Sequence, residues 1–128
     1  MSDEKSTHGT FCWNELVTRD DEGAAKFYTE LLGWKIVDSG MPGMKYSMLN
    51  AGDKNAGGMM AMPPDVPAEV PSHWLAYITV DDVDAAAAKA KELGGTILQV
   101  PTDIPTIGRF CIIQDPTSAV VALITLTG

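Results

Sequence analysis

The sequence predicts an α+β fold: one domain over residues 1–128, made of two β-α-β-β-β modules in tandem. Three observations lead to this prediction. The length of 128 residues suits a single domain. Residues Thr18–Gly33 resemble residues Thr79–Gly94 at a constant offset of 61, with an Asp-Asp pair near the start and Leu-Gly at the end. Strand-like stretches flank both copies in the same order, which indicates an internal repeat.

Module one is expected over about residues 10–62. Its first strand is predicted at Phe11–Thr18, where strand-forming residues alternate with polar ones. A helix follows, capped by Asp20 or Asp21 and ended by Gly33. Turn-forming residues then separate three further short strands, which are predicted at residues 34–37, 46–49 and 56–61.

A proline-rich linker at residues 63–71 is expected to be neither helix nor strand, because proline fits poorly inside both. Module two, over about residues 72–127, repeats the order of module one. One helix covers only one face of each sheet, so the other module or a second chain must cover the opposite face. Two curved sheets that face each other enclose a hollow suited to a ligand. The elements of module two are a strand at 73–80, a helix at about 82–93, and strands near 96–100, 108–114 and 119–125.

Composition excludes several classes of function. The chain has 17 acidic and 9 basic residues and a net charge of −8, which argues against nucleic acid and anionic membranes as partners. No apolar stretch is long enough to cross a membrane, and the N-terminus does not read as a signal peptide. Two cysteines, Cys12 and Cys111, are too few for a disulfide framework and are expected to be small buried side chains. A cytoplasmic location is therefore expected.

Seven segments carry a resemblance to a known family: Trp13–Leu16, Ala24–Tyr28, Leu32–Trp34, Val80–Asp84, Leu93–Gly95, Gly108–Phe110 and Asp115–Pro116. In this order they resemble the glyoxalase, bleomycin-resistance and ring-cleaving dioxygenase superfamily, also called vicinal oxygen chelate proteins, from residue 10 onward. The resemblance implies paired modules that form a cupped, partly open eight-stranded sheet with the helices outside and the site within. It also implies a homodimer.

Metal-dependent members of that family hold their metal with four ligands, usually His or Glu, on the first and last strand of each module. Carried over by position, these fall on Trp13, Met59, Leu75 and Ala122. Trp, Leu and Ala offer no usable lone pair, and the soft Met thioether does not suit Zn²⁺, Mg²⁺ or Fe²⁺. No metal and no other cofactor is expected, and neither is metal-dependent glyoxalase or dioxygenase activity.

Strand alternation gives a second indication of what lines the cup. His73, Leu75 and Tyr77 share a face that mixes apolar with hydrogen-bonding groups, as a ligand pocket requires. The family register adds Trp13, which either stacks on a flat ligand or belongs to the core. It also adds Met59, which is expected to face the cup, and Ala122.

Glu15 is the most informative polar residue, because a carboxylate in mid-strand on an enclosed face can serve as a general base or bind a ligand amine. Alternatively, it pairs with a base such as Arg109 or reaches solvent at the rim. His73 is either a proton carrier or a rim residue. Arg109 either holds a substrate carboxylate or pairs with a neighbouring acid.

The leading hypothesis is a metal-independent protein that binds a small apolar or aromatic molecule in the cup. The alternative is a metal-free lyase, isomerase or glyoxalase-like enzyme with Glu15 as general base. A third class, a regulatory protein that binds a partner, would instead expose a large apolar patch outside the cup.

Overall fold

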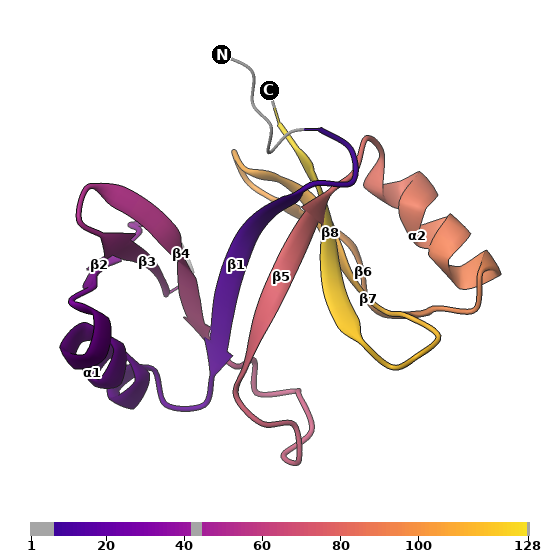
Figure 1. Cartoon of the computed structure of the whole chain (residues 1–128). Coiled ribbons are helices and arrows are strands. Elements are labelled where there is room, and N and C mark those ends of the chain that lie inside the picture. The colour runs from indigo at the N-terminus through magenta and orange to yellow at the C-terminus, as the bar shows by residue number, and fades with distance from the viewer. Residues whose placement is uncertain (1–6, 42–44, 128) are drawn as a thin grey trace. The chain divides into compact units, whose positions relative to one another are not determined.

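The computed structural model describes residues 7–41 and 45–127 (Figure 1). Residues 1–6, part of the N-terminal stretch considered above, lie outside the described residues. The predicted order of two β-α-β-β-β modules is confirmed, and so is the α+β class. The elements are β1 (Phe11–Thr18), α1 (Asp21–Leu32), β2 (Lys35–Asp38), β3 (Tyr46–Ala51), β4 (Lys54–Ala61), β5 (His73–Thr79), α2 (Val83–Glu92), β6 (Thr96–Ile104), β7 (Gly108–Gln114) and β8 (Val120–Leu126).

The strands follow the order β2-β3-β4-β1-β5-β8-β7-β6 in an open mixed sheet. By its internal contacts the chain divides into two compact units. We call residues 14–75 the α1 unit, and residues 1–13 together with 76–128 the α2 unit. In the described parts of both units, neither helix is long and apolar enough to cross a membrane.

In the α1 unit, β4 runs parallel to β1 and antiparallel to β3, which in turn pairs with β2. The Asp20 carboxylate accepts a hydrogen bond from the Gly23 amide at 2.9 Å, so Asp20 is the N-cap of α1. Gly33 ends the helix with a φ of 72°, a left-handed conformation that favours glycine. Both ends of α1 are therefore fixed by the residue types that predicted them.

The core of the α1 unit lies between α1 and its sheet. Leu16, Leu49 and Met59 are buried there. The partly buried side chains packed against them come from α1 and from the chain just after it: Ala24, Ala25, Tyr28, Trp34 and Ile36. Alternate positions on β1, β3 and β4 consequently face away from the helix.

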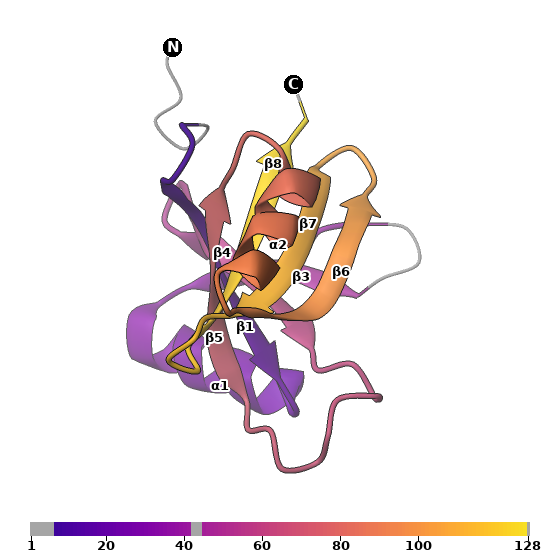
Figure 2. The same ribbon diagram turned by 90° about the vertical axis from the view of Figure 1, so that its right-hand side faces the viewer.

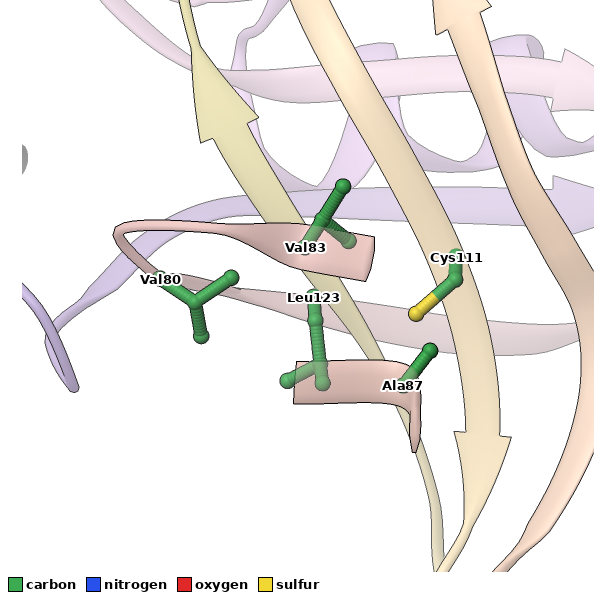
Figure 3. Packing of buried hydrophobic residues seen from close by; sticks show 5 residues of the cluster. All are labelled: Val80, Val83, Ala87, Cys111 and Leu123. Atoms are coloured by element: carbon green, nitrogen blue, oxygen red, sulfur yellow. The ribbon is translucent and has the colours of Figure 1, made fainter. Parts of the chain in front are cut away.

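In the α2 unit, β5 pairs in parallel with β8, and β8, β7 and β6 follow antiparallel. Asp82 caps α2 through bonds to the amides of Asp84 and Ala85. The helix contacts β6, β7 and β8 (Figure 2). Figure 3 shows the buried core between them, formed by Val80, Val83, Ala87, Cys111 and Leu123.

Strand β6 is longer than predicted, because it continues through Pro101 to Ile104. Proline lacks an amide hydrogen and is tolerated only where no neighbour requires one. β6 stands at the end of the strand order, and its register with β7 shifts between Gln99 and Thr102. The edge position of β6 and its bulge therefore accommodate Pro101, although proline usually marks the end of a strand.

The linker at residues 63–71 has no helix or strand, as predicted. Arg19 holds it in place: its Nε donates to the Val70 carbonyl and its Nη2 to the Pro67 carbonyl, both at 2.8 Å. The Arg19 amide also donates to Ser72 Oγ at 3.0 Å. The linker is thus anchored to the end of β1 within the α1 unit.

Cys12 and Cys111 are buried free thiols, as predicted. Burial raises the pKa of the Cys111 thiol, because the charged thiolate would be poorly solvated between α2 and the sheet. Both cysteines serve as small apolar side chains in the α2 unit.

We expect Leu123→Ala to lower the free energy of unfolding by about 2–5 kcal/mol, because it leaves a cavity in the α2 core. Leu98→Ala, at a position that is 52% exposed in the same unit, should change it by less than about 0.5 kcal/mol. Urea denaturation followed by circular dichroism measures both values. Equal losses in the two variants would contradict the assignment of the core.

Candidate functional site

Glu15 and Tyr46 form a buried polar pair on the sheet of the α1 unit. Glu15 is 5% exposed and Tyr46 is 9% exposed. The Tyr46 hydroxyl donates to Glu15 Oε1 at 2.8 Å. Such a bond to an ionised carboxylate is stronger than one between neutral groups, and it fixes where the carboxylate points.

Gly58 makes this contact possible. It lies opposite Glu15 in the register of β1 and β4, and Tyr46 lies opposite Met60 in the register of β3 and β4. A Cβ at Gly58 would overlap the Tyr46 hydroxyl and ring. The phenol therefore crosses over β4 at Gly58 and occupies the space that a side chain at position 58 would take.

These residues define the face of the α1 unit that points away from α1. We call it the carboxylate face. Alternation along β1, β3 and β4 adds apolar side chains to the polar pair. Its members are Glu15, Val17, Tyr46, Met48, Gly58 and Met60.

Met59 is not on this face, so our expectation for its orientation is wrong. Met59 is 4% exposed and packs with Leu16 and Leu49 beneath α1. In the α2 unit Ala122 lies opposite Tyr77, whereas in the α1 unit the residue opposite Glu15 is Gly58. The position equivalent to Ala122 is therefore Gly58, and the carry-over that assigned this position to Met59 is wrong by one residue.

In the α2 unit, Tyr77 and Ala122 point away from α2, since Ile78 and Leu123 beside them pack toward it. Tyr77 is 6% exposed and Ala122 is fully buried. The rings of Tyr77 and Phe110 lie 6.3 Å apart between centroids. Aromatic rings therefore lie on this face, and its predicted mixture of apolar with hydrogen-bonding groups as a ligand surface remains a prediction.

Trp13 is the last residue of β1 that belongs to the α2 unit, and Leu75 is the last residue of β5 that belongs to the α1 unit. Trp13 is partly buried. Leu75 is 4% exposed and stands two residues before Tyr77 on β5. Their predicted roles in ligand binding remain predictions.

Arg109 pairs with neighbouring acids, one of the two alternatives left open by the sequence. Its guanidinium contacts Asp84 on α2 at 3.0 Å and Asp103 on β6 at 3.1 Å. The hydrogen bonds to Asp84, and then those to Asp103, raise the pKa of Arg109. Arg109 thus ties α2 to the edge of its own sheet.

His73 begins β5, where its Nδ1 lies 2.8 Å from the Pro71 carbonyl oxygen. This contact holds the imidazole beside the linker when Nδ1 carries the proton. The ring is partly buried. Its role as a proton carrier remains a prediction.

The residues at the four positions carried over from the metal-dependent proteins do not fit a divalent cation. With Gly58 in place of Met59, they are Trp13, Gly58, Leu75 and Ala122, and none of their side chains supplies an oxygen or imidazole ligand. Across residues 7–41 and 45–127, no group of three or more His, Cys, Asp or Glu side chains is arranged to hold a metal ion.

The profile of the Glyoxalase/Bleomycin resistance protein/Dioxygenase superfamily matches residues 10–123. "Putative glyoxylase CFP32" of Mycobacterium tuberculosis is 42% identical over 119 residues, which cover 91% of this chain and 44% of that protein. The anthracycline biosynthesis protein DnrV of Streptomyces peucetius is 35% identical over 119 residues, covering 92% and 42%. The chain spans less than half the length of these relatives.

Solved structures share the fold. Methylmalonyl-CoA epimerase from Mycobacterium tuberculosis superposes with a TM-score of 0.63 at 15% identity, covering 100% of this chain and 94% of the other. A variant of homoprotocatechuate 2,3-dioxygenase from B. fuscum gives a TM-score of 0.60 at 18% identity, covering 96% of this chain and 34% of the other. At these identities the similarity concerns the fold alone.

Tyr46→Phe should lower the free energy of unfolding by about 1.5–3 kcal/mol, because it removes a hydrogen bond to a buried carboxylate. Glu15→Gln alone and in combination with Tyr46→Phe completes a double-mutant cycle, in which we expect the two effects to be non-additive. Tyr28→Phe, on the side of α1 that packs on the core, is the control. Its effect on the free energy of unfolding should be additive with that of Glu15→Gln. Additive effects of Tyr46→Phe and Glu15→Gln would contradict the pairing.

Proposed function

Because the chain belongs to the Glyoxalase/Bleomycin resistance protein/Dioxygenase superfamily, we propose that it binds a small apolar or aromatic molecule without a metal ion. The ligand contacts the carboxylate face, where Glu15 and Tyr46 form its polar anchor. The observation that carries this proposal is the buried Glu15–Tyr46 pair beside Gly58.

The composition of the carboxylate face supports a ligand of this class. Met48 and Met60 are partly buried, flexible and polarisable, and such side chains adapt to varied apolar ligands. One polar anchor among apolar side chains is the usual composition of a small-molecule site.

Metal independence is supported by the chemistry of four side chains, and the ligand class is supported by a relative. The side chains at the four positions carried over by resemblance offer no ligand atom for a divalent cation: Trp13, Gly58, Leu75 and Ala122. DnrV is named as an anthracycline biosynthesis protein, and anthracyclines are planar aromatic compounds with hydroxyl groups. A hydroxyl on such a ring can donate to Glu15 while the ring contacts the apolar side chains.

A second candidate function is a metal-free enzyme of the glyoxalase-like, lyase or isomerase type, favoured by the 42% identical relative named as a glyoxylase. Glu15 would take a proton from a carbon next to a carbonyl group, and the electron pair would move onto the carbonyl oxygen. Tyr46 would act as a positioning residue, because its bond to Oε1 orients the carboxylate.

A hydroxylated anthraquinone should bind to the protein in the presence of EDTA, measured by quenching of tryptophan fluorescence. Glu15→Gln should weaken binding about tenfold, which corresponds to one lost hydrogen bond to a charged group. Glu22→Gln, at an exposed position in the first turn of α1, is the matched control and should leave affinity unchanged. Binding that EDTA abolishes, or that Glu15→Gln does not affect, would contradict the proposal.

The enzyme hypothesis predicts turnover of a thiohemiacetal formed from methylglyoxal and a thiol, again in the presence of EDTA. Glu15→Gln should then lower kcat at least a hundredfold, in the range expected for loss of a general base. Tyr46→Phe should reduce kcat less, since it removes only the orientation of the carboxylate. Equal turnover by the wild type and Glu15→Gln would exclude Glu15 as the base.

A further inference from the structure

We propose that His8 is a pH-sensitive switch, which exchanges its hydrogen-bond partner near the start of α2 when the imidazole gains a second proton. His8 belongs to the N-terminal segment of the α2 unit, residues 7–10. Its Nδ1 accepts a hydrogen bond from the Asp81 amide at 3.0 Å. The Asp81 carboxylate lies beside the same nitrogen, with Oδ2 at 3.7 Å. One ring nitrogen therefore has both a donor and an acceptor of the same residue within reach.

Main-chain hydrogen bonds hold the N-terminal segment in place independently of the charge on His8. The Gly9 amide donates to the Thr79 carbonyl at 2.7 Å, and the Thr79 amide donates to the Thr10 carbonyl at 2.8 Å. Neither bond involves a group that titrates. The imidazole therefore stays close to Asp81 in both of its protonation states, and protonation changes the contact within this pair.

The hydrogen bond from the Asp81 amide fixes the tautomer of the neutral imidazole. An amide N–H can only donate, so Nδ1 of His8 must offer a lone pair and the single ring proton must lie on Nε2. In the imidazolium ion both ring nitrogens carry protons and neither accepts. Protonation therefore breaks the bond to the Asp81 amide. It also makes Nδ1 a donor, which the Asp81 carboxylate can accept.

The charged groups around His8 come from the end of β5 and from α2. Asp81, Asp82 and Lys89 line a shallow groove beside α2 together with His8. The Asp82 carboxylate is held by two amides of the first helical turn, whereas the Asp81 side chain is 84% exposed and can turn toward the ring. Two carboxylates and one ammonium group give the groove one net negative charge beside a neutral His8 and none beside the imidazolium ion. The switch therefore also changes the charge of this surface within the range of about pH 5 to 8.

His73 provides an internal comparison, since it is the second of the two histidines in the sequence. Its Nδ1 lies 2.8 Å from the Pro71 carbonyl oxygen, which can only accept, so this nitrogen carries the proton in the neutral ring. A second proton then goes to Nε2 and leaves the contact with Pro71 intact. The two histidines therefore have opposite tautomers, and of these two contacts only that of His8 depends on pH.

Nuclear magnetic resonance of the full chain labelled with ¹⁵N and ¹³C tests the switch. At pH 8, long-range ¹H–¹⁵N spectra should show the ring proton on Nε2 of His8 and on Nδ1 of His73. From pH 8 to pH 5, the protection of the Asp81 amide against hydrogen exchange should fall about five- to tenfold, as expected for the loss of one hydrogen bond. The carboxyl carbon of Asp81 should shift with the same midpoint as the His8 ring.

His8→Gln should make the protection of the Asp81 amide equal at pH 8 and pH 5, because the amide side chain of Gln does not titrate in this range. His73→Gln is the matched control and should leave the fall in protection unchanged. A proton on Nδ1 of His8 at pH 8, or a wild-type Asp81 amide equally protected at both pH values, would overturn the proposal. So would a fall in protection that persists in His8→Gln. An Asp81 carboxyl group that does not follow the titration of His8 would overturn the exchange of partners.

Discussion

The hydrogen bond from Tyr46 to Glu15 is the interaction on which this account depends. A carboxylate that is 5% exposed needs partners, and the phenol supplies one from a strand that is not adjacent to β1. The phenol can reach it only because position 58 is glycine. Three residues on three strands thus build a buried polar pair on the sheet of the α1 unit.

The two modules share a scaffold but have diverged in what they present. In the α2 unit, the strand pair that carries Tyr77 and Ala122 presents an aromatic, apolar face, and Arg109 ties helix and sheet together through Asp84 and Asp103. In the α1 unit, the equivalent strand pair carries Glu15 and Gly58. Divergence of this kind is expected after duplication, because burial beneath each helix preserves the fold while the other surfaces are free to acquire separate roles.

The sequence predicted the fold well, because local signals determine it. Asp20 and Gly33 delimit α1, Asp82 caps α2, and alternation identified β1 with its correct bounds. The site was predicted less completely. Glu15 was identified, but Tyr46 was not, because its contact depends on the register of β3 across β4 and no local pattern reports that register. Met59 was assigned to the wrong face because a one-residue error in offset reverses every side chain of a strand. The acidic partners of Arg109 lie 6 and 25 residues away, so only the folded chain identifies them.

The most direct test is calorimetric titration of Zn²⁺, Ni²⁺ and Mg²⁺ into protein purified without a histidine tag and stripped with EDTA. We expect no stoichiometric binding, because the four positions carried over by resemblance hold Trp13, Gly58, Leu75 and Ala122, whose side chains offer no oxygen or imidazole ligand. One ion bound per chain with micromolar affinity, and lost in Glu15→Gln, would show that Glu15 is a metal ligand and would contradict the central claim.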